Sequence, residues 1–174
     1  MTTPSQPARP ASAGEGVVVG LIGAAVVALF YLGIDLAKGQ PLMTPSILGE
    51  VFMFRRPEAV TTTADTSAVL LYTVAHLLVF IAFGSLLAWL TRRAELSSVA
   101  RYAILPMVLL FEFAFLGVLL IASETTRGFF PLWSILIANL LAAVAMLAFL
   151  WRNHPRIRRA MGRAPLGAPD FANE

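Results

Sequence analysis

The stretch Gly16–Ile34 reads GVVVGLIGAAVVALFYLGI and contains no charged side chain. An α-helix needs roughly 20 apolar residues to cross the hydrocarbon core of a bilayer, and this stretch has 19. Three more predominantly apolar stretches of similar length follow, at Ala68–Leu90, Tyr102–Ala122 and Phe130–Trp151. The sequence therefore predicts an all-α fold, a four-helix transmembrane bundle with spans at about 16–36, 68–91, 102–122 and 130–151.

The composition agrees with a membrane protein. Hydrophobic residues make up 58% of the chain and charged residues 13%, with a mean hydropathy of +0.77, whereas soluble domains are about half apolar and a quarter charged. The absence of cysteine excludes disulfides, thiolate metal sites and iron–sulfur clusters. The net charge of +3 comes from basic residues beside the spans, where anionic lipid headgroups are a better match than nucleic acid.

The basic residues also predict the orientation. With four spans, the two termini and the second connection lie on one side of the membrane, and the first and third connections on the other. The first side carries nine Lys and Arg residues: Arg9, Arg92, Arg93, Arg101, Arg152, Arg156, Arg158, Arg159 and Arg163. The other side carries four: Lys38, Arg55, Arg56 and Arg127. The positive-inside rule places the first side in the cytoplasm, here of a bacterial inner membrane.

The domain organisation follows from these spans. Residues 1–15 are polar and rich in Pro, Ala and Ser, so we expect a disordered cytoplasmic tail. Residues 16–155 form the transmembrane domain, and residues 156–174 form a basic cytoplasmic tail. Four arginines at this end are expected to contact anionic headgroups: Arg152, Arg156, Arg158 and Arg159.

The first connection contains a short predicted helix at about 45–54. Thr44 supplies a hydroxyl suited to capping, and Pro45 suits the first helical position. Four apolar residues then share one face: Ile47, Leu48, Val51 and Phe52. The pattern predicts an interfacial helix in the first extracytoplasmic loop, which lies along the membrane surface or dips into the mouth of the bundle. A lid over an outward-facing cavity is the alternative.

Polar side chains inside the spans are costly and mark the candidate site. With a rise of about 1.5 Å per residue, His76 lies about 12 Å deep, Asn139 about 13 Å and Glu112 about 15 Å from the outer surface. Tyr72 lies one turn from His76 on the same helix face. These four residues predict a polar cluster, which serves either as a hydrogen-bonded structural knot or as a proton, ion or ligand site. Near the end of the first span, Asp35 and Lys38 predict an interfacial ion pair.

Small residues recur every four positions in the first span, at Gly16, Gly20, Ala24 and Ala28. Such a face lets another helix approach closely. We expect it to serve packing within the bundle, with dimer formation as the alternative.

Catalytic and cofactor motifs are missing from the sequence. It contains no GxSxG, HExxH or phosphate-binding loop. One span histidine and one span glutamate are too few ligands for a metal site, and a b-type haem usually needs two facing histidines. The sequence therefore predicts no metal, no cofactor and no enzyme activity.

Three stretches resemble a group of small four-span bacterial membrane proteins of unassigned function: GQPLMTPSILG (39–49), YTVAHLLVFIAFG (72–84) and ANLLAAVAMLAFLWRNHP (138–155). The resemblance covers about residues 16–155 and directs attention to His76, Glu112 and Asn139. It implies no activity or cofactor.

Three functions are compatible with these features. The first is a non-enzymatic accessory or structural subunit, partnered by a larger membrane complex or by copies of itself. The second is a small proton-coupled carrier or proton-conducting protein that uses the Glu112 and His76 cluster. The third is a quinone- or haem-binding membrane protein.

Overall fold

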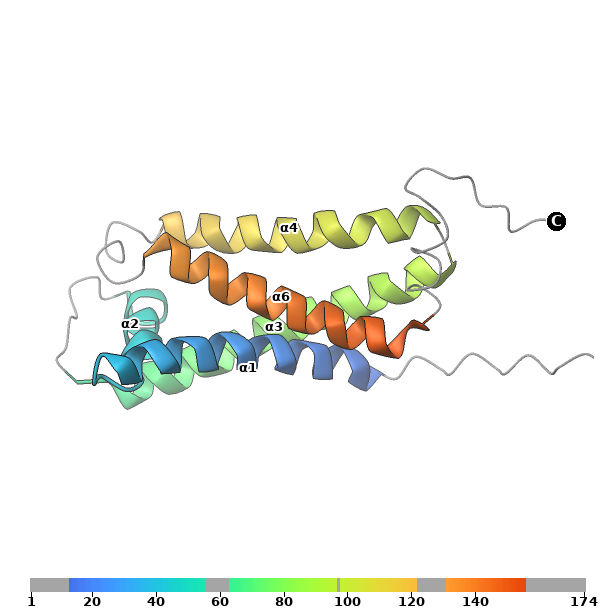
Figure 1. The fold of residues 1–174 in the computed structure, drawn as a ribbon. Helices are drawn as coiled ribbons and strands as arrows, with labels where there is room; N and C mark the ends of the chain where they lie inside the picture. Colours follow the sequence, from blue (N-terminus) through green and yellow to red (C-terminus); the bar gives the residue numbers. More distant parts are fainter. Residues whose placement is uncertain (1–12, 56–62, 97, 122–130, 156–174) are drawn as a thin grey trace, which may run out of the picture.

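The computed structural model describes residues 13–55, 63–96, 98–121 and 131–155 (Figure 1). Within these ranges the chain is all-helical and has no strand. Its helices are, in chain order, α1 (Ala13–Ala37), α2 (Met43–Phe52), α3 (Thr66–Leu96), α4 (Ser98–Ile121) and α6 (Leu132–Asn153).

Three of the helices are long and apolar enough to cross a membrane: α1 over Gly14–Ala37, α3 over Thr66–Glu95 and α6 over Trp133–Asn153. The apolar part of α4 runs over the shorter range Tyr102–Gly117. In Figure 1, α1, α3, α4 and α6 run roughly along one direction, with α2 at the end where α1 finishes and α3 begins. The protein is therefore a helical membrane protein by length and composition.

The helix boundaries differ from the expected spans by a few residues. α1 begins at Ala13, so residues 13–15 belong to the helix rather than to the tail, and α3 continues to Leu96. Both extensions are polar helical turns, which the apolar pattern cannot detect. The remainder of the expected tails and the third connection lie outside the described residues.

The contact between α1 and α3 is built on glycine. A methyl group on Gly16 would collide with Ser85, one on Gly20 with the backbone of Phe80 and Ile81, and one on Gly84 with the backbone of Gly20. The two helices therefore touch backbone to backbone, which is the geometry that small residues permit in membranes. This confirms that the small-residue face of the first span packs within the bundle, although Ala28 at its end is exposed.

The third wall of the core comes from α6, which packs against α1. The apolar side chains that it buries in this core are Ala138, Ala142, Ala143, Met146 and Leu150. A Cβ on Gly23 of α1 would meet the sulfur of Met146 and the ring of Phe80. The core therefore combines small residues at the α1–α3 contact with larger side chains next to that contact.

The connection from α1 to α2 is a closed turn. The amide of Gly39 donates to the carbonyl of Leu36 (3.0 Å), and the amide of Gln40 donates to the carbonyl of Asp35 (2.9 Å). This pair of bonds, with Gly39 at φ 70°, is a Schellman motif. It reverses the chain so that α2 begins beside the last turn of α1.

The start of α2 differs from the prediction. Leu42 occupies the N-cap position with φ 64°, and Pro45 is the third residue of the helix rather than the first. Thr44 does not cap the helix, because its hydroxyl donates to Asp35 Oδ1 (2.7 Å) and its amide to Asp35 Oδ2 (2.7 Å). The carboxylate of Asp35 thus supplies, from α1, an acceptor for one of the first amides of α2.

The helix α2 is inserted among the long helices at this end. Leu48 is 6% exposed and packs in a cluster with Ile135 of α6. Gly49 faces the backbone of Ala68, so that no side chain would fit between α2 and α3. Ser46 accepts a hydrogen bond from the amide of Asp65 (2.8 Å), the residue whose carboxylate caps α3 through the amides of Ser67 and Ala68.

Candidate ligand-binding site

Two members of the expected polar cluster meet between α4 and α6. The carboxyl group of Glu112 shares a side-chain hydrogen bond with Asn139, and Asn139 is 4% exposed. A cavity of only about 10 Å³ lies beside them. That is about the minimum needed for one water molecule, so the pair is closely packed.

His76 has a different environment. Its Nε2 lies 3.2 Å from the carbonyl oxygen of Ala24 in α1. A carbonyl can only accept, so Nε2 carries the hydrogen. A charged ring is costly at membrane depth, and the neutral ring leaves Nδ1 as an acceptor. The ring is stacked on Tyr72 (centroids 5.7 Å apart, 27° between planes) and lies 4.7 Å from the ring of Phe80.

Phenylalanine rings lie between the two polar pairs. The ring centroids of Phe80 and Phe111 lie 5.8 Å apart. Both residues line the small cavity at Glu112 and Asn139, and both also line a larger cavity at His76. Among the described residues no hydrogen bond joins His76 to Glu112. The structure therefore places the cluster members in two groups, one on the α1–α3 side and one on the α4–α6 side.

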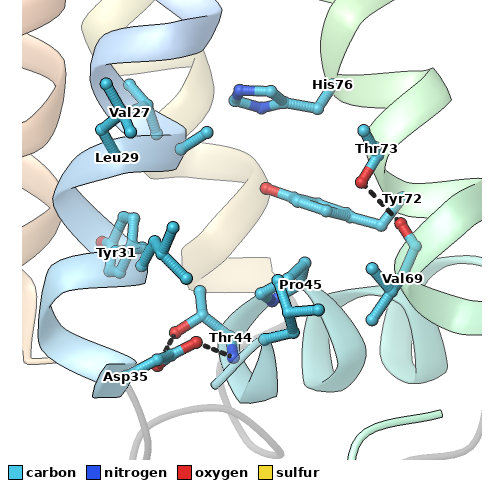
Figure 2. A pocket seen from close by; sticks show the side chains of 13 residues that line it. Val27, Leu29, Tyr31, Asp35, Thr44, Pro45, Val69, Tyr72, Thr73 and His76 are labelled. Atoms are coloured by element: carbon cyan, nitrogen blue, oxygen red, sulfur yellow. Dashed lines mark hydrogen bonds between the residues drawn. The ribbon is translucent and has the colours of Figure 1, made fainter. Parts of the chain in front are cut away.

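A cavity of about 180 Å³ lies between α1, α2 and α3 (Figure 2). We call it the α1–α3 cavity. It is lined mainly by apolar side chains of α1 and by Pro45 and Val69, with Tyr72 and His76 on one wall. The hydroxyl of Tyr72 points from α3 toward α1 across this space (Figure 2). Leu29, at 66% exposure, and the exposed Thr73 also line the cavity, so it opens at the helix surface between α1 and α3.

Most polar atoms around the α1–α3 cavity already have partners. Asp35 is bonded to Thr44 through both carboxylate oxygens. The Thr73 hydroxyl donates to the carbonyl of Val69 (2.7 Å). Two hydrogen-bonding groups are left for a bound molecule within the described part of the chain, the Tyr72 hydroxyl and the Nδ1 atom of His76.

A second cavity, of about 380 Å³, lies on the other side of Tyr72 and His76. We call it the α3–α4 cavity. Its walls come from α3 and α4, from Leu48 and Phe52 of α2, and from Met53 directly after α2. Apart from Tyr72 and His76 its lining is apolar. The two cavities share these two side chains as a common wall.

The interfacial ion pair expected between Asp35 and Lys38 is not formed. Asp35 is 3% exposed and has Thr44 as its partner, whereas Lys38 is exposed. The turn at Gly39 explains the difference, since it brings α2 back over the carboxylate. Of the expected headgroup contacts, Arg152 is exposed in the last turn of α6, and Arg156, Arg158 and Arg159 lie outside the described residues.

A polar contact at the opposite end of the bundle was not predicted from the sequence. His154, directly after α6, lies 2.9 Å from Glu95 of α3 through Nδ1 and 2.9 Å from Glu15 of α1 through Nε2. Its side chain is 11% exposed, so it is not a fully solvated residue. These contacts join the ends of three helices. The three residues are far apart in sequence. Only their common position near helix ends could have suggested the contact.

Comparison with protein-family models, curated proteins and solved structures finds no match. The resemblance to small four-span bacterial proteins therefore stays a prediction. Among the described residues, no group of three or more His, Asp or Glu side chains is arranged to hold a metal ion.

Proposed function

We propose that this chain is a non-catalytic integral membrane protein that binds a lipid-soluble molecule, with the polar head of that molecule in the α1–α3 cavity. The observation that carries the proposal is the Tyr72 hydroxyl, which enters a mainly apolar cavity open at the helix surface. Ligand sites of this kind are largely apolar, with few polar groups that fix orientation.

The dimensions of the cavities indicate the class of ligand. An apolar cavity of about 150 Å³ accommodates one benzene ring, so 180 Å³ is suited to a single six-membered ring. Tyr72 can donate to a ring oxygen, and His76 Nδ1 can accept from a ring hydroxyl. The α1–α3 cavity opens at the helix surface, so an apolar tail on that ring would extend from it into the surrounding lipid. This chemistry is that of a quinone or quinol with an apolar tail.

The proposal includes the finer topology. We propose that α4 is a fourth span. The chain reaches one end of the bundle at the end of α3 and begins α6 at the other end, so α4 carries it back between the two (Figure 1). With both termini in the bacterial cytoplasm, α2 is an extracytoplasmic helix at the outer mouth of the bundle. The α1–α3 cavity then opens toward the outer half of the bilayer.

The two other candidate functions receive less support from the geometry. A proton path needs a continuous row of hydrogen-bonding groups, and the rings of Phe80 and Phe111 lie between His76 and Glu112. The accessory-subunit interpretation stays a prediction that co-purification tests. The exposed apolar faces of α4 and α6 suit lipid and a protein partner equally.

We expect Tyr72→Phe to weaken binding of a short-tailed benzoquinone, decyl-benzoquinone, by about fivefold, because one hydrogen bond worth about 1 kcal/mol is removed. Val69→Phe, which fills the α1–α3 cavity, should abolish binding. Binding would be measured by equilibrium dialysis against protein in lipid nanodiscs. The matched control is Tyr102→Phe on α4, a tyrosine that lines neither cavity.

Thermal unfolding of the unliganded variants separates binding from folding. Tyr72→Phe should unfold at the wild-type temperature, because the hydroxyl has no hydrogen-bond partner among the described residues. Wild-type affinity in both Tyr72→Phe and Val69→Phe would show that the probe binds elsewhere and would overturn the proposal. Equal weakening in Tyr72→Phe and Tyr102→Phe would do so as well.

A further inference from the structure

A third cavity, of about 300 Å³, lies between the end of α1 and the beginning of α6. We call it the α1–α6 cavity. Lys38, directly after α1, lines one side, and Pro131 and Trp133, at the start of α6, line the other. The ends of membrane-crossing helices lie at the depth of the lipid headgroups. Trp133 is 58% exposed, as expected of an aromatic residue at that depth.

Lys38 is an available cation in this cavity. Its side chain takes part in no ion pair among the residues that the structure describes. The nearest carboxylate in sequence, that of Asp35, is committed to the amide and hydroxyl of Thr44. The serine hydroxyl of the cavity, Ser134, donates to the carbonyl of Pro131 (2.8 Å). Lys38 is the one charged side chain among the described residues that line this cavity, so a ligand that it recognised would be an anion.

The remaining lining decides between a free anion and a lipid. Ile34, Pro131 and the ring of Trp133 give the cavity apolar walls beside the ammonium group. A free inorganic anion gains nothing from apolar walls, whereas a phospholipid presents a phosphate directly above glycerol and acyl carbons. A volume of 300 Å³ equals about ten water molecules at about 30 Å³ each, which is enough for a glycerophosphate group.

We propose that the α1–α6 cavity binds the phosphate of an anionic phospholipid, with Lys38 as the cationic contact and Trp133 and Ile34 against the first carbons of the lipid. The site is separate from the α1–α3 cavity and does not depend on a ligand there. One lysine at a membrane surface contributes about 1 kcal/mol to anionic lipid binding, or about fivefold in affinity.

The test compares lipids bound to protein released from nanodiscs that contain phosphatidylcholine with or without phosphatidylglycerol. Native mass spectrometry counts the lipids retained, and thermal unfolding reports stabilisation. We expect wild type and Lys38→Arg to retain one phosphatidylglycerol in preference to phosphatidylcholine, and Lys38→Gln to lose this preference about fivefold. The matched control is Arg55→Gln, which removes a positive charge from an exposed residue at the same end of the bundle but outside the cavity.

Three results would overturn the proposal. Equal loss in Lys38→Gln and Arg55→Gln would show a general effect of charge. An unchanged lipid preference in Lys38→Gln would exclude Lys38 as the contact. Stabilisation of lipid-free protein in neutral detergent by inorganic phosphate, equal to that by phosphatidylglycerol, would assign the cavity to a free anion instead of a lipid. A loss in Lys38→Gln that Tyr72→Phe does not share supports a site distinct from the α1–α3 cavity.

Discussion

Replacement of Gly84 by leucine should prevent α1 and α3 from packing and abolish the stable fold. A side chain at this position meets the backbone of Gly20 on the opposite helix. Backbone atoms cannot rotate away as a flexible side chain can. Over-packing of a core typically costs about 1–3 kcal/mol and sometimes more, and a backbone-to-backbone contact belongs at the upper end of that range. We expect Gly84→Ala to destabilise the protein in the same way, but by less.

The chain offers a matched control for this substitution in Gly33. A Cβ on Gly33 meets nothing within 4 Å, so Gly33→Leu adds the same apolar group to a membrane helix without a collision. The measurement is thermal unfolding and size-exclusion behaviour of each variant in a mild detergent. Equal stability of Gly84→Leu and Gly33→Leu would show that α1 and α3 do not make this contact.

Asp35→Ala should destabilise the protein by about 3 kcal/mol, because hydrogen bonds to a carboxylate are worth about 1.5–3 kcal/mol each. Two such bonds are lost, from the amide and from the hydroxyl of Thr44 (2.7 Å each). Asp35 is 3% exposed, so water cannot readily replace the lost acceptor. The substitution should release the start of α2 from α1.

The control for Asp35→Ala distinguishes the two partners of this carboxylate. If Asp35 acted through Lys38, as the sequence predicts, Lys38→Ala would destabilise the protein as much. From the structure we expect Lys38→Ala to have no such effect on stability. We expect Thr44→Val to lose about half as much stability as Asp35→Ala, because only the hydroxyl is removed. In the double variant Asp35→Ala/Thr44→Val, the losses should be less than additive. Unfolding by denaturing detergent would measure each variant, and additive losses would argue against the contact.

The sequence predicted the fold to the extent that hydropathy determines it. The apolar stretches became helices within a few residues of the expected bounds, and the glycine face of the first span found its partner in α3. The short helix was also predicted, but its start was placed two residues late. The local signal from Thr44 and Pro45 was overridden by the carboxylate of Asp35, which is a tertiary contact.

The candidate site was only partly predictable because depth along a helix does not determine rotation about its axis. Depth placed His76, Glu112 and Asn139 in one layer, and Glu112 does meet Asn139. His76 faces α1, however, and bonds to the carbonyl of Ala24. Nor does depth reveal empty space. Residues of α2 line both cavities beside His76, and no periodicity in the sequence encodes how α2 sits against the long helices.

The most direct test of the account asks whether four helices cross the membrane. The sequence has no cysteine, so each single-cysteine variant carries one thiol. Suitable exposed positions are Gln40 after α1, Arg93 near the end of α3 and Asn153 at the end of α6. In intact spheroplasts, an impermeant maleimide should label Gln40→Cys but not Arg93→Cys or Asn153→Cys, and permeabilisation should expose all three. Labelling of Arg93→Cys and Asn153→Cys from opposite sides would mean that α4 does not cross and would contradict the account.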